Sequence, residues 1–200
     1  MFLAVAPCTG AAMSELRESP SRLVRQETVG DAARIEALNA AAFGPGRFAK
    51  SAYRLREGVA PVAGLSFVAV ENPKGQGEIL RGSVRFWPVR VGGEEVLLLG
   101  PLAVETAERG RGIGIGLMQA GIEAARRGPW SAILLVGDEP YYAKVGFARL
   151  PPGRVTFPGP VDPNRILGLS LKPGGLLNLS GQVRRAQIDD PVCADGAPVG

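Results

Sequence analysis

The chain has 200 residues, a formal net charge of +4 at pH 7, 46% hydrophobic residues and 21% charged residues. These values suit one soluble globular domain with room for a hydrophobic core. The sequence contains no histidine, which removes the commonest general base, the commonest metal ligand and Ser-His or Cys-His catalysis. The cysteines, Cys8 and Cys193, lie near opposite ends, which argues against a metal site, a disulfide framework or cysteine catalysis.

The distribution of charge and hydropathy predicts the compartment and the partners. No apolar run is long enough to span a bilayer, and Met1–Cys8 lacks the basic region of a secretory signal. Basic residues occur in pairs, such as Arg126-Arg127, rather than in blocks of five or more. We therefore expect a cytoplasmic protein that binds neither nucleic acid nor membrane, and a homodimer is left open.

The predicted elements lie between two flexible tails, residues 1–20 and 188–200, which lack periodicity. The domain of residues 21–187 begins with a strand over Leu23–Thr28. Asp31 is then a suitable N-cap for a helix that ends at Gly44-Pro45-Gly46. A second helical stretch follows to about Arg56.

The middle of the chain predicts a hairpin and a central strand. Leu65–Glu71 and Ile79–Val91 form the hairpin, and Glu95–Val104 forms the strand. Proline cannot donate a ladder hydrogen bond, so Gly100-Pro101 predicts either a simple strand end or a bulge at which the sheet opens. An opened sheet would leave main-chain groups of Leu102 and Val104 available to a ligand.

Alternating glycines follow this strand, at positions 110, 112, 114 and 116. Glycines leave backbone N–H groups uncovered, and the helix predicted from about Gly112 to Arg127 adds the positive end of its dipole. Arg109 and Arg111 add positive charge, so the segment is built to bind a phosphate or diphosphate. The spacing fits neither a Walker loop nor a dinucleotide fingerprint. The apolar residues expected to face the core from this helix are Ile113, Leu117, Ala120 and Ala124.

A second motif follows the buried strand predicted over Ala132–Val136. Here the sequence runs from Gly137-Asp138 through Tyr141-Tyr142 to Gly146-Phe147. Further strands are predicted over Arg165–Leu171 and near Leu176–Val183.

The two motifs together resemble the GNAT superfamily of N-acetyltransferases. The resemblance rests on Arg-x-x-Gly-x-Gly at Arg109, Gly112 and Gly114, and on the aromatic-Tyr-x-x-x-Gly-Phe pattern ending at Phe147. Phe43–Phe48 and the Gly-Asp before the tyrosines look most like the YhbS-type branch. The resemblance implies an α/β (α+β) fold, with a mixed central sheet flanked by helices and splayed at its central strands.

The resemblance also implies that acetyl-CoA is the donor, with no metal. Main-chain groups of Leu102 and Val104 would bind the pantetheine arm. The diphosphate would be bound by the loop residues Arg109, Gly110, Arg111, Gly112, Ile113 and Gly114.

Tyr142 is the expected catalytic residue, as a general acid toward the departing thiolate, unless its ring packs into the core instead. Tyr141 is expected to pack in the core. The general base stays open among Asp138, Glu139, Glu105, Glu95 and water, and Asp138 is equally well explained as a helix cap.

The resemblance implies transfer of an acetyl group to a primary amine by direct attack in a ternary complex. The acceptor, a small molecule or a protein, is expected to contact Phe43–Tyr53 and Arg154–Leu177. The alternative is a catalytically silent sensor or interaction domain that binds acyl-CoA.

Overall fold

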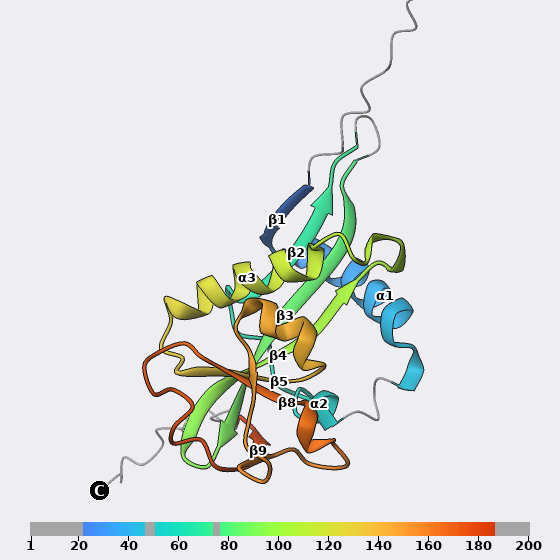
Figure 1. Ribbon diagram of the computed structural model, residues 1–200. Helices are drawn as coiled ribbons and strands as arrows, with labels where there is room; N and C mark the ends of the chain where they lie inside the picture. Colours follow the sequence, from blue (N-terminus) through green and yellow to red (C-terminus); the bar gives the residue numbers. More distant parts are fainter. Residues whose placement is uncertain (1–21, 47–50, 74–76, 187–200) are drawn as a thin grey trace, which may run out of the picture.

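The structure is a computed structural model that describes residues 22–46, 51–73 and 77–186 (Figure 1). Both predicted tails, residues 1–20 and 188–200, lie outside these ranges. Within the described part, no helix is both long and apolar enough to cross a membrane.

Strands rich in buried apolar residues build a mixed sheet. The first four strands pair antiparallel in chain order: β1 (Arg22–Gln26), β2 (Ser66–Glu71), β3 (Ile79–Val91) and β4 (Glu94–Val104). β4 pairs in parallel with β5 (Ala132–Val136), which continues antiparallel to β8 (Ile166–Ser170) and then β6 (Ala148–Arg149). β9 (Gly181–Arg185) pairs with β3 and with β7 (Val155–Thr156).

Helices connect and cover these strands, and the predicted mixed α/β class is confirmed. The longer ones are α1 (Ala32–Phe43) and α3 (Ile113–Arg126), and the short ones are α2 (Ser51–Arg54) and α4 (Glu139–Tyr142). Single 3₁₀ turns are η1 (Val29–Asp31), η3 (Thr106–Glu108), η4 (Ala143–Val145) and η5 (Pro163–Arg165).

The two faces of the sheet bury different helices, as Figure 1 shows for α3 and α1. Strand residues alternate between faces, so Phe67 packs in the cluster with α3, whereas Val68 contacts α1. α3 lies close to the sheet because Gly121 leaves room for a ring: a Cβ there would come within 2.3 Å of Phe86 Cε2.

The buried stripe of α3 differs from the predicted one. Ile113 and Leu117 are buried as expected, but Ala120 and Ala124 are only half-buried. Met118, Ile122 and Ala125 are buried in their place. Met118 and Ile122 have larger apolar side chains than alanine, and Ala125 is completely buried. The helix is therefore rotated from the predicted stripe toward these residues.

The predicted opening of the sheet at Gly100-Pro101 is confirmed. Between the pairs Val84↔Leu102 and Phe86↔Leu99, β4 contains one residue more than β3, so it is bulged there. β4 pairs with β5 only at Leu97 and Leu98, although both strands continue. The edge of β4 that faces away from β3 is therefore unpaired with β5 beyond Leu98.

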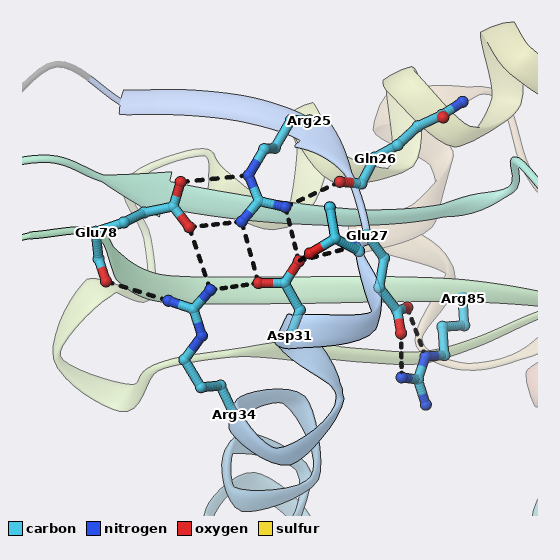
Figure 2. Close-up of polar contacts among 8 residues, drawn as sticks. Arg25, Gln26, Glu27, Asp31, Arg34, Glu78 and Arg85 are labelled. Atoms are coloured by element: carbon cyan, nitrogen blue, oxygen red, sulfur yellow. Dashed lines mark hydrogen bonds and ion pairs between the residues drawn. The ribbon is translucent and has the colours of Figure 1, made fainter.

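Asp31 occupies the predicted N-cap position of α1, but its side chain makes no cap hydrogen bond to this helix. Its fully buried carboxylate accepts hydrogen bonds from Arg25 (2.7 and 3.0 Å) and from Arg34, as Figure 2 shows. It also accepts from the main chain and hydroxyl of Thr28 (2.9 and 2.8 Å). Glu78 binds the same two arginines. These contacts tie β1, α1 and the start of β3 together, and Arg25 holds the pKa of Asp31 well below its usual range.

The strand predicted near Leu176–Val183 is shorter and later, because residues 173–178 form turns. The Arg154 side chain donates to the carbonyl oxygens of Leu176 (2.6 Å) and Leu179 (3.0 Å). These bonds fix the turn against Arg154, and strand pairing starts at Gly181.

Candidate active site

The glycine loop presents a run of free backbone N–H groups at the start of α3. Gly112, at the N-cap, has a φ of +81°, in the left-handed region that favours glycine. The first backbone hydrogen bond of the helix runs from Gly116 N to Gly112 O. Within the described part of the chain, the N–H groups of residues 110–115 have no backbone acceptor. Six consecutive amides are therefore free to bind an anion.

A cavity of about 380 Å³ lies against this loop. Its lining includes seven of the residues predicted to bind the donor: Leu102, Val104, Arg109, Gly110, Gly112, Ile113 and Gly114. The eighth, Arg111, does not line the cavity, and its guanidinium pairs with Glu108 at 3.0 Å. We call this space the donor cavity.

Two charged residues of the donor cavity were not anticipated. Glu108 is buried, and its carboxylate pairs with Arg22 (3.1 Å) as well as with Arg111. These two arginines neutralise it beside the loop. Lys144, two positions after Tyr142, adds a positive side chain to the lining. The sequence offers one signal for Lys144, its place in the tyrosine motif, and none for Glu108.

Tyr142 is positioned by tight packing at the end of α4. Its ring makes edge-on contacts with Phe147 and Tyr141, at centroid distances of 6.1 and 5.2 Å. Gly137 leaves the space that the ring occupies, because a Cβ there would lie 2.2 Å from Tyr142 Cε2. Burial raises the pKa of Tyr142 to about 12, so the phenol keeps its proton at neutral pH.

Tyr141 is not a core residue, contrary to prediction. It is 37% exposed and lines the donor cavity. Its hydroxyl lies over the first turn of α3, where a Cβ at Gly114 would come within 2.1 Å of it. The second glycine of the Gly-x-Gly pattern is thus the position against which this tyrosine packs.

A second cavity, of about 510 Å³, adjoins the donor cavity. The two share Phe43, Leu102 and Tyr142 in their linings. We call it the acceptor cavity. Of the segment predicted to contact an acceptor, Phe43, Ala52 and Tyr53 line it, and residues 47–50 lie outside the described ranges. No residue of the other predicted segment, Arg154–Leu177, belongs to the lining.

None of the four carboxylates considered as a general base lines either cavity. Three have arginine partners: Asp138 pairs with Arg165 (3.1 Å), Glu139 with Arg149 (2.8 Å) and Glu105 with Arg81. Asp138 occupies the N-cap position of α4, as the capping alternative expects, but its side chain makes no cap hydrogen bond.

Glu95, the fourth, is exposed near the turn between β3 and β4. The carboxylates that do line the acceptor cavity are Glu36 and Glu57, which the sequence did not single out. Among the described residues, no group of three or more potential metal ligands gathers.

Comparison with known proteins decides the family. The model of the acetyltransferase (GNAT) family matches residues 33–147, a segment that contains both the glycine loop and the tyrosine motif. The chain belongs to the GNAT family. Over 127 residues it is 34% identical to the uncharacterized N-acetyltransferase YhbS of Escherichia coli K12, which covers 62% of this chain and 72% of YhbS.

Solved GNAT structures share the fold. YhbS from Escherichia coli in complex with CoA superposes with a TM-score of 0.69 at 28% identity, covering 84% of this chain and 91% of that one. A GNAT family acetyltransferase from Brucella melitensis in complex with acetyl-CoA gives 0.59 at 26% identity, covering 83% and 96%. The resemblance to GNAT proteins, and to YhbS among them, is thus confirmed.

Proposed function

We propose that this protein transfers an acetyl group from acetyl-CoA to a primary amine by direct attack while both substrates are bound. The observation that carries the proposal is the meeting of the donor and acceptor cavities at Tyr142. A thioester in one cavity and an amine in the other would meet beside this side chain. Two solved relatives, bound to CoA and to acetyl-CoA, support the choice of donor.

We assign the parts of acetyl-CoA to the donor cavity in order along its lining. The free amides of residues 110–115 and the N-terminus of α3 suit the diphosphate, and the Arg109 and Lys144 side chains add positive charge. Arg111 contributes through its main chain and by neutralising Glu108. Beyond Leu98, the free edge of β4 offers main-chain groups of Leu102 and Val104 to the amides of the pantetheine arm.

The chemistry needs no protein nucleophile. The amine attacks the thioester carbonyl, a C–N bond forms, and the C–S bond breaks with its electron pair on sulfur. A thiol of ordinary pKa, about 8.5, is a much stronger acid than a phenol whose pKa is about 12. Tyr142 therefore acts mainly by donating a hydrogen bond to the departing thiolate, rather than by giving up its proton completely.

The amine must also lose a proton. Because Glu36 and Glu57 line the acceptor cavity, we assign this task to one of these carboxylates or to water. The four carboxylates first considered lie outside both linings and are not proposed for it.

The test is a panel of amines incubated with acetyl-CoA and the purified protein, with free thiol and acetylated amine measured by mass spectrometry. We expect stoichiometric thiol release and product formation with wild type, and loss of both in Gly112→Asp. Saturable acetyl-CoA binding without thiol release, both with this panel and in cell extract, would contradict the proposal and support the silent acyl-CoA sensor.

A further inference from the structure

The acceptor cavity contains a positive side chain, Arg56, that forms no ion pair within the described ranges. Arg56 lies after α2 and is half-buried in the lining. Its Nε donates to Ala52 O at 2.9 Å, which anchors one side of the guanidinium. The group lies 5.7 Å from the Tyr53 ring centroid and 5.9 Å from that of Trp87. Two aromatic rings and one hydrogen bond therefore hold it in place.

Arg56 has no carboxylate partner among the residues that the structure describes. Of the other charged groups in the lining, Arg85 pairs with Glu27 (2.8 Å) and Glu57 with Arg185 (3.7 Å), while Glu36 has an interaction of its own. Burial lowers the pKa of Arg56 to about 10, and the charge of Arg85 acts in the same direction. The guanidinium is nevertheless charged at neutral pH. Desolvation of a cation costs stability, and the contacts with Ala52 and the two rings leave its charge without an ionic partner in the described ranges.

Other polar atoms of the same lining lack partners as well. Trp87 Nε1 is a buried donor with no acceptor, and Asn39 Oδ1 is a buried acceptor with no donor, within the described ranges. Asn39 is 4% exposed. Buried polar atoms are almost always paired in folded proteins. These two atoms are closed off from solvent, so they show that hydrogen bonding around the cavity is incomplete but are not themselves contacts for a ligand. The half-buried guanidinium of Arg56 is the charged group of this lining that has no ionic partner in the described ranges, and an anionic group on the acceptor would complement it.

We propose that the acceptor is a small amine bearing a carboxylate or a phosphate, and that Arg56 binds this anionic group. The inference rests on the proposed function, because it names the substrate class of the same site. The Nη groups of Arg56 make no hydrogen bond within the described residues, and a planar fork of N–H groups binds either anion through two oxygens. A volume of about 510 Å³ suits a small molecule.

The experiment uses sets of amines with one carbon skeleton and three end groups: a carboxylate, a phosphate and a neutral carboxamide. β-Alanine, O-phosphoethanolamine and β-alaninamide form the first set, and longer skeletons follow. Acetyl transfer is measured with wild type, Arg56→Gln, Arg56→Lys and, as the matched control, Arg126→Gln, whose exposed arginine lies at the end of α3.

In wild type we expect the anionic members to have lower KM values than the amide. In Arg56→Gln, we expect KM for the anions to rise about 10- to 100-fold, because hydrogen bonds to a charged group are lost. KM for the amide and the affinity for acetyl-CoA should not change. Arg56→Lys should be intermediate, and Arg126→Gln should match wild type. Equal KM values for anions and amide in wild type, or equal losses for both in Arg56→Gln, would overturn the inference.

Binding of the same amines to the CoA-loaded protein, measured by calorimetry, separates the two proposals. Anion binding that Arg56→Gln abolishes, without turnover, supports the anion site but contradicts the proposed function. Turnover of neutral amines with no preference for anions supports the proposed function but contradicts the anion site. If the amines are not turned over and their binding does not depend on Arg56, the inference is overturned.

Discussion

Replacing Gly137 with alanine should displace Tyr142 without touching the donor loop. The new Cβ would lie 2.2 Å from Tyr142 Cε2 and 2.9 Å from Cδ2. Ordinary contact begins at 3.4 Å, so the ring has to move by about 1.2 Å. The backbone of Gly137 is not in the left-handed region, so alanine can adopt its backbone conformation and the only conflict is the contact of the new Cβ.

A displacement of about 1 Å at a reacting group typically costs about 100-fold in rate. We therefore expect Gly137→Ala to lower kcat for acetyl transfer about 100-fold, with the dissociation constant of acetyl-CoA unchanged. The assay is thiol release with an accepted amine, together with calorimetry for the donor. The matched control is Gly93→Ala, whose added Cβ meets nothing within 4 Å.

A double-mutant cycle tests whether the effect passes through the tyrosine. In the Tyr142→Phe background, Gly137→Ala should cost far less than in wild type, because the hydroxyl that it displaces is already gone. Wild-type kcat in Gly137→Ala, or the same loss in both backgrounds, would refute the reasoning.

Three other predictions concern the tyrosine and the ion-pair network. Tyr142→Phe should bind acetyl-CoA like wild type and slow transfer about 100-fold; an equal rate would reassign the ring to packing. Because burial raises the pKa of Tyr142 to about 12, the phenol should stay protonated through pH 10, and the tyrosinate absorbance lost in Tyr142→Phe should titrate near 12. A midpoint near 10 would contradict the buried environment. Asp31→Asn should lower the free energy of unfolding by about 2 to 3 kcal/mol at pH 7, less than for a completely buried pair because Arg25 and Arg34 are partly exposed. Since the pKa of Asp31 is lowered in the folded state, its contribution is present above the ordinary value near 4 and is lost as pH falls through the folded value. Urea unfolding should therefore show the difference between variant and wild type shrinking only below about pH 4, and a constant difference down to pH 2 would contradict the assignment.

Local sequence signals predicted the elements that carry the donor site. The bulge at Gly100-Pro101 follows from the missing N–H of proline, and the anion loop follows from glycines before a helix. Seven of the eight residues expected at the donor line one cavity for this reason. Arg111 is the exception because its pairing with Glu108 depends on where the side chains lie, which spacing does not determine.

Features that depend on distant segments were missed or wrong. The buried carboxylate of Asp31 binds Arg25 from β1, so a local capping rule was overridden by a tertiary contact. The acceptor cavity combines residues of α1, α2, β3 and β4, and no periodicity marks Arg56 as facing it. Both cases involve charged side chains whose roles are set by what packs around them.

The most direct test of the account is calorimetric titration of acetyl-CoA and of acetyl-pantetheine into wild type, Gly112→Asp and Gly112→Asn. Acetyl-pantetheine lacks the diphosphate and the 3′-phosphoadenosine attached to it. Asp and Asn tolerate the left-handed conformation of this position better than other residues, and space beside it is open, so the pair differs mainly in charge. We predict that wild type binds acetyl-CoA far more tightly than acetyl-pantetheine. Gly112→Asp should lose this preference, and Gly112→Asn should keep most of it. Equal acetyl-CoA affinity in wild type and Gly112→Asp would contradict the claim that the amides of residues 110–115 bind the diphosphate.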